Sequence, residues 1–522
     1  MKANIKLKTL VKSCNQKKVK ITMRMNKLEV LSTEEIEIIH NQTLDLLEEI
    51  GVKVESPETR LYLKEKGCIL ERGDHFVKFP RDLVEKHLEI VPNSFSLWGP
   101  DGSFQLDINT KTVNFATVGT PVKIYDPTHN KGIRRTVLSD TIKQIRIVDS
   151  LKNIHCSHVD VWPNDIPYTE LHWHAICAWA KNSFKPYGLG CLGRTPSQDM
   201  MNLLSIIVGG EKELIKRPRF IGFYNPTSPL IHTQILLNGL FIFAKYNQPL
   251  IIAPAASAGS TAPITLAGLL VQANMETLSA IVLTQLINPG TPVFYSSMSA
   301  PMDPASGNVA WGSIETGLIS AATAQMARFY DIPSRGPGAV TESKCFDIQN
   351  GFERFMTLFT SAHAGINYIT CAGTYESSLS EALELLVIDD ELCSIVKRGL
   401  EGIRVDTESL AIEEIKRVAT TGKSYLSLKH TVKNIRKEIF VPLLSDRDRR
   451  GIWQRAGAKE IMDKAKEKIK EILETQKGPG VSKEVESKLN EYYKIISART
   501  YDDYRKLEGM EDSNETIDLP DS

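Results

Sequence analysis

The longest hydrophobic pattern in the chain lies between residues 257 and 297. A helix expected from Ile264 to Asn288 carries a single charged residue, Glu276, among fifteen apolar ones, so it has no face suited to solvent. The segments on either side, PLIIAPA and TPVFYSS, are hydrophobic without alternation, which is typical of parallel strands covered on both faces. This pattern predicts a buried βαβ unit inside a large α/β domain.

The same strand and helix pattern recurs through the middle of the chain. Extended segments, each followed by a helical stretch, are predicted at residues 114–118, 154–161, 186–192, 219–224, 249–254, 291–297, 333–340 and 367–373. Eight such units indicate an α/β fold of the (β/α)8 TIM-barrel type, with a doubly wound open sheet as the alternative. In a barrel, active-site residues lie in the loops that follow the carboxyl ends of the strands.

Helical segments are expected on both sides of a barrel spanning residues 113–400. Residues 29–112 form a predicted N-terminal cap of helices and short strands; its first helix begins at Ser32, with Glu35 completing a capping box and Gly51 ending the helix. Residues 401–507 are rich in lysine at helical spacing and predict a C-terminal helical extension.

The two ends of the chain are one-sided in charge. Residues 1–28 contain nine Lys or Arg and no acid, and residues 508–522 contain six acids and no base. Segments of this composition cannot bury enough apolar surface to fold, so we predict a basic disordered extension and an acidic tail. Removing residues 1–24 is therefore expected to leave thermal stability unchanged.

Composition and charge narrow the functional classes. The chain has 522 residues, of which 42% are hydrophobic and 24% charged, as in ordinary globular proteins. Its 63 basic residues balance 63 acidic ones, so it has no overall basic field for nucleic acid. The eight cysteines form no CxxC pair, and the apolar helix around Glu276 is interrupted by Thr, Gln and Asn. We therefore expect a cytoplasmic protein with no membrane-spanning segment.

Two short motifs favour structural explanations. YGLGCLGR contains a literal GxGxxG at Gly188, Gly190 and Gly193, but these glycines fall within a predicted strand, so tight packing or close approach of a ligand is favoured over dinucleotide binding. His172 and His174 form an HxH pair in a segment of helical period, which places the two imidazoles on different faces. We predict core histidines here and no metal site.

The ends of the predicted strands bring polar and aromatic candidates to one face of the barrel. They are Asp160, Trp162, Arg194, Tyr224, Asn225, Ser257, Thr261, Tyr295 to Ser297, Thr341 to Lys344, and Thr374 to Glu376. A second set consists of acids beside apolar residues, where an unpaired carboxylate is costly: Glu276, Glu315, Asp347, Glu353, Asp389, Asp390 and Glu391. Each acid alone is explained more simply as a helix cap or ion-pair partner. As a set they predict an anionic interior suited to a cationic substrate.

Several of these segments, in this order, resemble one known family. They are LSTEEIEIIHNQTLDLLEEIGVKVESPE, AGSTAPITLAGLLVQANMETLSAIVLTQLINPGTPVFY, ESKCFDIQNGFERF, ELLVIDDEL and AKEKIKEILE. They are similar to the trimethylamine:corrinoid methyltransferase family over nearly the whole chain. The resemblance implies a (β/α)8 barrel that moves a methyl group from a methylated amine to the Co(I) of a separate corrinoid protein.

One departure from the family narrows the expected substrate. The founding members carry pyrrolysine, whereas this chain contains only the twenty standard residues. A tertiary amine is a poor methyl donor without the activation proposed for pyrrolysine, because it would have to leave as an amide anion, whereas a quaternary ammonium leaves as a neutral tertiary amine. The chain therefore resembles the non-pyrrolysine branch, which acts on glycine betaine and related quaternary amines.

This interpretation assigns roles to the candidate residues. A quaternary ammonium has no N–H to donate, so aromatic faces and nearby carboxylates must hold it. The expected aromatic ligands are Trp162, Tyr224, Tyr295 and Tyr375, with Asp160 beside them and Glu315, Asp347 and Glu353 as catalytic acids. If the substrate also carries a carboxylate, the expected partners are Arg194, Asn225 and Lys344.

The expected partners are a small methylated amine and a cognate corrinoid protein, with a homo-oligomer as a plausible assembly. The chain has no Asp-x-His-x-x-Gly corrinoid motif, so we expect no directly bound cofactor and a corrinoid presented by the partner. Three alternatives stay open: a metal-dependent barrel hydrolase using His172 and His174, a non-catalytic binder of betaine-like solutes, and a barrel acting on another methyl donor such as a methylated thiol.

Overall fold

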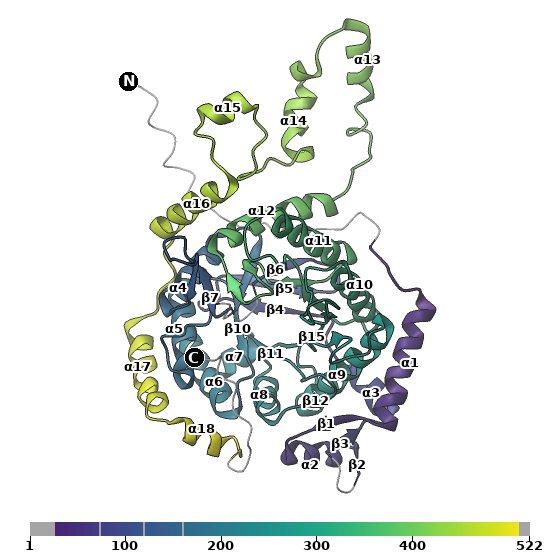
Figure 1. Ribbon diagram of the computed structural model, residues 1–522, viewed down its shortest axis with the longest axis vertical. Coiled ribbons are helices and arrows are strands. Elements are labelled where there is room, and N and C mark those ends of the chain that lie inside the picture. Colours follow the sequence, from purple (N-terminus) through teal and green to yellow (C-terminus); the bar gives the residue numbers. More distant parts are fainter. Residues whose placement is uncertain (1–26, 72–74, 118–120, 159–160, 511–522) are drawn as a thin grey trace.

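The centre of the molecule is a closed barrel of eight parallel strands (Figure 1). The computed structural model describes residues 27–71, 75–117, 121–158 and 161–510, so residues 1–26 of the predicted basic extension, residues 511–522 of the predicted acidic tail and Asp160 lie outside the described residues. Around the barrel the strands are β10 (Tyr187–Gly190), β11 (Phe220–Tyr224), β13 (Leu250–Ile252), β15 (Val293–Ser296), β17 (Ser334–Pro337), β18 (Tyr368–Thr370), β6 (Asn114–Ala116) and β9 (Ile154–His158). Each falls within a predicted strand, so the barrel prediction is confirmed.

Helices alternate with these strands and form the outer ring. They are α4 (Leu138–Ser150), α5 (Leu171–Asn182) with a short 3-10 turn η1 (Tyr168–Glu170) before it, α6 (Arg194–Val208) followed by α7 (Glu211–Lys216), α8 (Gln234–Lys245), α9 (Leu266–Ile287), α10 (Ile314–Phe329), α11 (Ile348–Ala364) and α12 (Leu383–Leu400). Parallel strands must be joined by crossover connections, and the helices supply them.

Helix α9 is the predicted buried helix, and it begins and ends within two residues of the prediction. Within the described part of the chain it is the one helix long and apolar enough to cross a membrane, but most of it is buried inside the protein against α1 (Thr33–Glu49) and α8. The seven cysteines that the structure describes form no disulfide.

The N-terminal segment packs on one side of the barrel, as Figure 1 shows in purple. Helix α1 has the predicted capping box, in which the Ser32 hydroxyl accepts from the backbone N–H of Glu35 and the Glu35 carboxylate accepts from Ser32. Gly51 follows the helix with φ +71°, a left-handed conformation that favours glycine. The next elements are β1 (Val52–Val54), α2 (Pro57–Glu65), β2 (Ile69–Leu70), β3 (Phe76–Lys78) and α3 (Arg81–Leu88); β1 pairs with β12 (Ile231–His232) from the loop after β11.

A hairpin closes the amino-terminal end of the barrel. Its strands are β4 (Ser94–Trp98) and β5 (Gln105–Asn109), and Trp98 N–H donates to the carbonyl of Pro218, just before β11. Phe95 of the hairpin lies edge-on to Phe294 of β15, with ring centroids 5.2 Å apart. Because this end is filled, the carboxyl ends of the strands are the open end of the barrel.

Small two- and four-stranded sheets extend the loops at the open end. One contains β19 (Thr374–Tyr375), β20 (Ser380–Glu381), β7 (Lys123–Tyr125) and β8 (Ile133–Arg135), and another pairs β14 (Ser257–Ala258) with β16 (Ala300–Pro301). They join the loops that follow β18 and β6, and those that follow β13 and β15.

The chain after α12 forms two distinct parts. Residues 401–460 make an arm that projects from the barrel and contains α13 (Ile412–Thr421), the 3-10 turn η2 (Tyr425–Ser427), α14 (Lys429–Glu438) and α15 (Arg450–Arg455) (Figure 1). The helices α16 (Ile461–Thr475), α17 (Lys483–Ser497) and α18 (Tyr501–Leu507) then return along the outer ring, where α16 packs on α12 and α4, and α17 on α6.

Candidate active site

Strand alternation decides which side chains face the barrel interior. Paired residues on neighbouring parallel strands point to the same side, and Phe223, Ser296, Arg335 and Tyr368 belong to the inward-facing set. We call the interior that they line, together with His158 at the end of β9, the bore.

Arg335 is the most unusual side chain in the bore. It is fully buried in the middle of β17, and its guanidinium carbon lies 5.0 Å from the ring centroid of Phe223. None of its three guanidinium nitrogens has a hydrogen-bond partner among the described residues. Burial lowers the pKa of Arg335 to about 10, so the group stays charged at neutral pH.

His158 lies beside this cation and is held as a neutral imidazole. Burial, together with the charge of Arg335, lowers the pKa of His158 to about 3. Its Nε2 lies 3.0 Å from the hydroxyl of Tyr368, and its Nδ1 has no partner among the described residues. Gly188 provides the space for the ring, because a Cβ at that position would lie 2.4 Å from Nδ1.

Aromatic and polar groups continue from Arg335 toward the open end. Phe223, Met298 and Trp311 pack against the buried residues Val340 and Cys371 and are partly exposed, so this part of the bore reaches solvent. The indole N–H of Trp311 donates to the carbonyl of Met298 at 3.0 Å, which fixes the ring over the loop after β15. The buried hydroxyl of Ser296, next to Arg335 in register, has no partner in the described part of the chain.

Two carboxylates meet next to Trp311. Glu353 accepts hydrogen bonds from the Thr341 hydroxyl at 2.6 Å and from the backbone N–H of Glu342 at 3.0 Å, while Glu342 accepts from the N–H of Gly312 at 2.6 Å. Burial raises the pKa of Glu342, and the charge of Glu353 adds to the rise. Oε1 of Glu342 has no partner among the described residues. The site therefore runs from a buried cation, past aromatic faces, to an acidic pair.

Comparison with known proteins places the chain in a family. Residues 4–499 match the model of the family described as trimethylamine methyltransferase (MTTB). The chain belongs to this family. It is 32% identical over 469 residues to a glycine betaine methyltransferase of Desulfitobacterium hafniense, covering 89% of this chain and 96% of that protein.

Relatives named for a different amine are equally similar. A trimethylamine methyltransferase, MttB, of Methanosarcina barkeri is 34% identical over 456 residues, covering 85% of this chain and 90% of that protein. The predicted family is thus confirmed, and the protein is a methyltransferase. Since the two kinds of relative are almost equally similar, the substrate has to be argued from the site.

Two predicted aromatic ligands of the methyltransferase point away from the bore. Tyr224 packs among the outer helices and its hydroxyl lies 2.6 Å from Nδ1 of His232. Tyr295 donates from its hydroxyl to Asn274 of α9 at 2.8 Å and stacks near Tyr330. Each is the outward neighbour of an inward-facing residue, Phe223 for Tyr224 and Ser296 for Tyr295.

The other two predicted aromatic residues lie in loops at the carboxyl ends of the strands. Trp162 is half-buried and stacks on Tyr168, with centroids 5.8 Å apart. Tyr375 is buried, with its ring 5.4 Å from that of Phe346, which itself meets Tyr125 edge-on.

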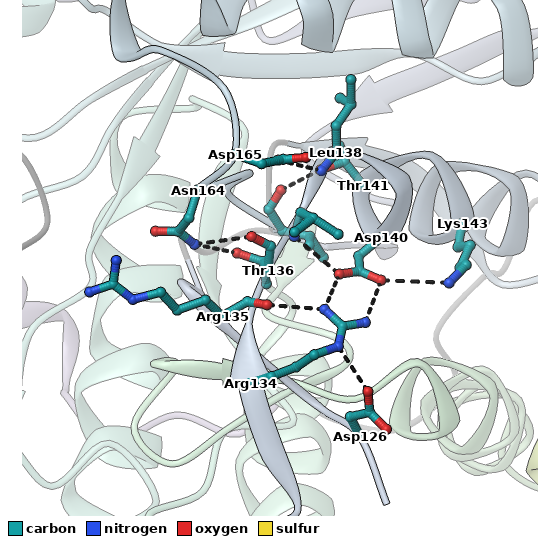
Figure 2. A network of polar contacts seen from close by, with 12 residues as sticks. Asp126, Arg134, Arg135, Thr136, Leu138, Asp140, Thr141, Lys143, Asn164 and Asp165 are labelled. Carbon is teal, nitrogen blue, oxygen red and sulfur yellow. Dashed lines mark hydrogen bonds and ion pairs between the residues drawn. The ribbon is translucent and has the colours of Figure 1, made fainter. Parts of the chain in front are cut away.

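A polar network holds the loop that carries Trp162, as Figure 2 shows. Arg134 forms a two-point ion pair with Asp140, with N–O distances of 2.6 and 2.9 Å, and this ties β8 to the start of α4. Asn164, two residues after Trp162, donates to the Thr136 hydroxyl at 2.8 Å. Because each donor in this network has an acceptor, we assign it a positioning role and no chemistry.

The predicted carboxylate partners are engaged elsewhere or exposed. Arg194 forms an ion pair with Glu58 of α2 on the outer surface, and Asn225 donates to the carbonyl of Ala253 at 2.8 Å. Lys344 is exposed. The structure thus directs neither Arg194 nor the amide of Asn225 to the bore.

Most of the acids predicted to line an anionic interior have structural partners instead. Glu276 accepts from Ser228 and the N–H of Leu230, which anchors the loop after β11 to α9. Asp389 pairs with Arg354, Asp390 accepts from the N–H of Asn153, and Glu391 accepts from the backbone of residues 443–445. Among the described residues that line the bore, the charged side chain is Arg335.

The predicted catalytic acids differ in their surroundings. Glu353 is buried in the acidic pair, whereas Asp347 is exposed and caps α11 by accepting from the N–H of Asn350 at 2.9 Å. Glu315 is half-buried in the first turn of α10. Glu353 accepts from the N–H of Glu342, and Glu342 in turn accepts from Gly312, the residue after Trp311. Of the three acids, Glu353 is therefore the one near Trp311.

The glycine motif and the histidine pair have structural roles. Gly193, with φ +110°, precedes α6, whose first N–H groups, from Arg194 and Thr195, donate to the carboxylate of Glu508 at 2.8 Å each. A carboxylate of the chain thus takes the place that a phosphate would occupy in a nucleotide site. His172 lies 3.2 Å from Asp199, and His174 lies 3.7 Å from Glu170, so the two rings have separate partners.

Proposed function

We propose that the bore binds a quaternary amine and presents one of its methyl groups to the Co(I) of a separate corrinoid protein. Membership of the methyltransferase family supports methyl transfer. At the open end, the aromatic faces of Phe223 and Trp311 lie near the acidic pair Glu342 and Glu353. This observation supports a quaternary amine as the substrate. Aromatic faces and carboxylates attract a cation that has no N–H to donate.

The reaction balances without an activating group on the nitrogen. The electron pair of Co(I) forms a bond to the methyl carbon, the C–N bond breaks, and its electrons stay on nitrogen, which leaves as a neutral tertiary amine. The cobalt becomes methyl-Co(III). This suits a chain built only of the twenty standard residues, because no group has to convert a poor leaving group into a better one.

The chain's own residues then have positioning and electrostatic roles. The aromatic faces orient the ammonium group so that one methyl points out of the barrel, where a corrinoid protein can approach. Glu353, with Glu342, stabilises the bound cation, Glu315, Asp347 and Lys344 add charge around the site, and Trp162 and Tyr375 belong to its rim. We also place the protein in the cytoplasm, because Co(I) survives only under reducing conditions.

Cobalt methylation tests this proposal. Glycine betaine, carnitine, proline betaine, choline and trimethylamine are offered in parallel with cob(I)alamin, and methyl-cobalt formation is followed by absorbance. Transfer from at least one quaternary amine, with almost none from trimethylamine, is expected. Turnover of trimethylamine alone would contradict the quaternary assignment.

An aromatic variant sharpens the same test. Trp311→Ala should weaken binding of the active amine by about 0.5–2 kcal/mol, up to roughly thirtyfold in affinity. Trp453→Ala, in α15 of the projecting arm, is the matched control and should leave the affinity unchanged. Equal effects of the two substitutions would show that Trp311 does not hold the substrate.

A further inference from the structure

Arg335 is a buried cation for which the described residues provide no hydrogen-bond acceptor. A buried ionised group is tolerated when it is paired and hydrogen-bonded, and burying it alone is costly. Three other buried cations follow that rule: Arg354 pairs with Asp389, Lys185 donates to three backbone carbonyls at 2.5 to 2.7 Å, and Arg219 donates to the carbonyl of Gly99 at 2.6 Å. Arg335 alone among these four has no acceptor in the described part of the chain.

The surroundings of Arg335 are arranged for an anion. Phe223 lies against the guanidinium, with its ring centroid 5.0 Å from the guanidinium carbon. Beside it are the Ser296 hydroxyl and the neutral ring of His158, both buried and each with an unpartnered polar atom among the described residues. A planar fork with five N–H donors matches a carboxylate in two-point geometry.

The charges of the site also have an order. Arg335 is the deep, positive end, and Phe223 connects it through the packed cluster to Trp311, which is followed at Gly312 by the contact to Glu342. A positive end and an acidic end within one site are complementary to a molecule with the opposite arrangement. A simple cation such as trimethylammonium would satisfy only the outer half.

We propose that Arg335 binds the carboxylate of the substrate, so that the methyltransferase acts on a zwitterion whose carboxylate points into the barrel and whose quaternary nitrogen lies near Phe223 and Trp311. This inference rests on the proposed function and names its substrate class. Since Arg335 has no exposure of its own, binding requires the partly exposed ring of Phe223 to turn aside.

The test compares two amines that share a trimethylammonium group and differ at the other end. Glycine betaine carries a carboxylate and choline a neutral hydroxyl. For the wild type, kcat/KM for glycine betaine should exceed that for choline by about a hundredfold or more, because choline leaves the fork unpaired. Arg335→Gln should lose about a hundredfold with glycine betaine and change little with choline.

Two further variants separate recognition from folding. Arg335→Lys keeps the charge but loses the planar fork, so it should recover only part of the preference. Arg219→Lys is the matched control, since Arg219 is equally buried but lies at the closed end of the barrel, and the ratio between the two amines should stay unchanged. A preference that survives in Arg335→Gln would overturn the proposal.

Binding measured without turnover keeps the two proposals distinguishable. Calorimetry of glycine betaine with the wild type and Arg335→Gln should show an affinity loss of about a hundredfold, whether or not cobalt is methylated. Binding that depends on Arg335 without methyl transfer would refute the proposed function and uphold this inference. Methyl transfer from quaternary amines with no dependence on Arg335 would uphold the proposed function and refute this inference.

Thermal stability provides a third readout. Arg335→Met should raise the melting temperature of the ligand-free protein, because it removes a buried charge that has no partner in the described part of the chain. Glycine betaine should raise the melting temperature of the wild type and not that of this variant. A lower melting temperature for ligand-free Arg335→Met would show a structural role and overturn the proposal.

Discussion

Two buried arginines, 19 positions apart, show how this protein separates structure from binding. Arg354 on α11 is 1% exposed and pairs with Asp389 of α12; Asp389 also accepts from the N–H of Gly373 at 2.7 Å, and Arg354 donates to the carbonyl of Thr374. Arg335 on β17 is 0% exposed and has no such partner among the described residues.

The difference lies in where each side chain points. Between α11, α12 and the loop after β18, the protein itself supplies acceptors for Arg354. The buried charge therefore holds the loop against the outer helices. The described residues of the bore supply none for Arg335, although burial is as complete. A buried charge without a partner inside a barrel that is open at one end indicates a binding group.

The largest effect is expected from breaking the buried ion pair between Arg354 and Asp389. Arg354→Met removes the partner of Asp389 and leaves a carboxylate in a site with no exposure, which should lower the free energy of unfolding by about 3–5 kcal/mol. Urea denaturation measures the loss. The double variant Arg354→Met, Asp389→Leu should recover most of it, and no recovery would mean that the pair is not the cause.

The next largest effect on stability is expected from filling space in the bore. Gly188→Ala would place a Cβ 2.4 Å from Nδ1 of His158 and 2.9 Å from the carbonyl oxygen of Ile221, and should cost about 1–3 kcal/mol. Gly351→Ala is the matched control, because that helical position has open space around it and should gain up to about 1 kcal/mol. Equal stabilities would show that the bore relaxes freely.

A pH titration tests whether the bore tolerates a second cation. The pKa of His158 falls from an ordinary 6.5 to about 3, so between these values the unfolded chain binds the proton more readily than the folded one. The contribution of His158 to stability is complete above pH 6.5 and is lost as the pH falls toward 3, by at most about 1.4 kcal/mol per pH unit. His158→Asn should remove this part of the slope, and an unchanged slope would contradict it.

The smallest effect concerns an arginine at the surface. Arg194 and Glu58 are paired but largely exposed, so Arg194→Gln should change the free energy of unfolding by less than about 0.5 kcal/mol. The same variant should leave the preference for glycine betaine over choline intact, in contrast to Arg335→Gln. A loss of that preference would return Arg194 to the substrate site.

The sequence predicted the outer framework of the protein well. Eight strand segments, the buried helix α9 and the Ser32 capping box all depend on local hydrophobic spacing or on neighbouring side chains, and the structure has each of them. One of the acids that the sequence singled out, Glu353, lies in the acidic pair, but its neighbour Glu342 was included only as part of a loop.

Which side chains line the bore follows only from the closed barrel, not from the local sequence. In a parallel strand buried on both faces, alternate positions are all apolar or aromatic, so FIGFY and VFYS do not reveal whether Phe223 or Tyr224, and Ser296 or Tyr295, faces inward. Arg335 was the available signal, because an arginine within a buried strand is rare and requires a partner.

The sequence by itself thus determined the order of strands and helices, the family and the absence of a special amino acid in the chain. Only the tertiary structure decided which side chains share the bore, because β17, β18, β9 and β11 are brought together by long-range pairing and by the shear of the closed sheet. That arrangement leaves Arg335 without an acceptor among the described residues, while Arg354 on α11 has one in Asp389.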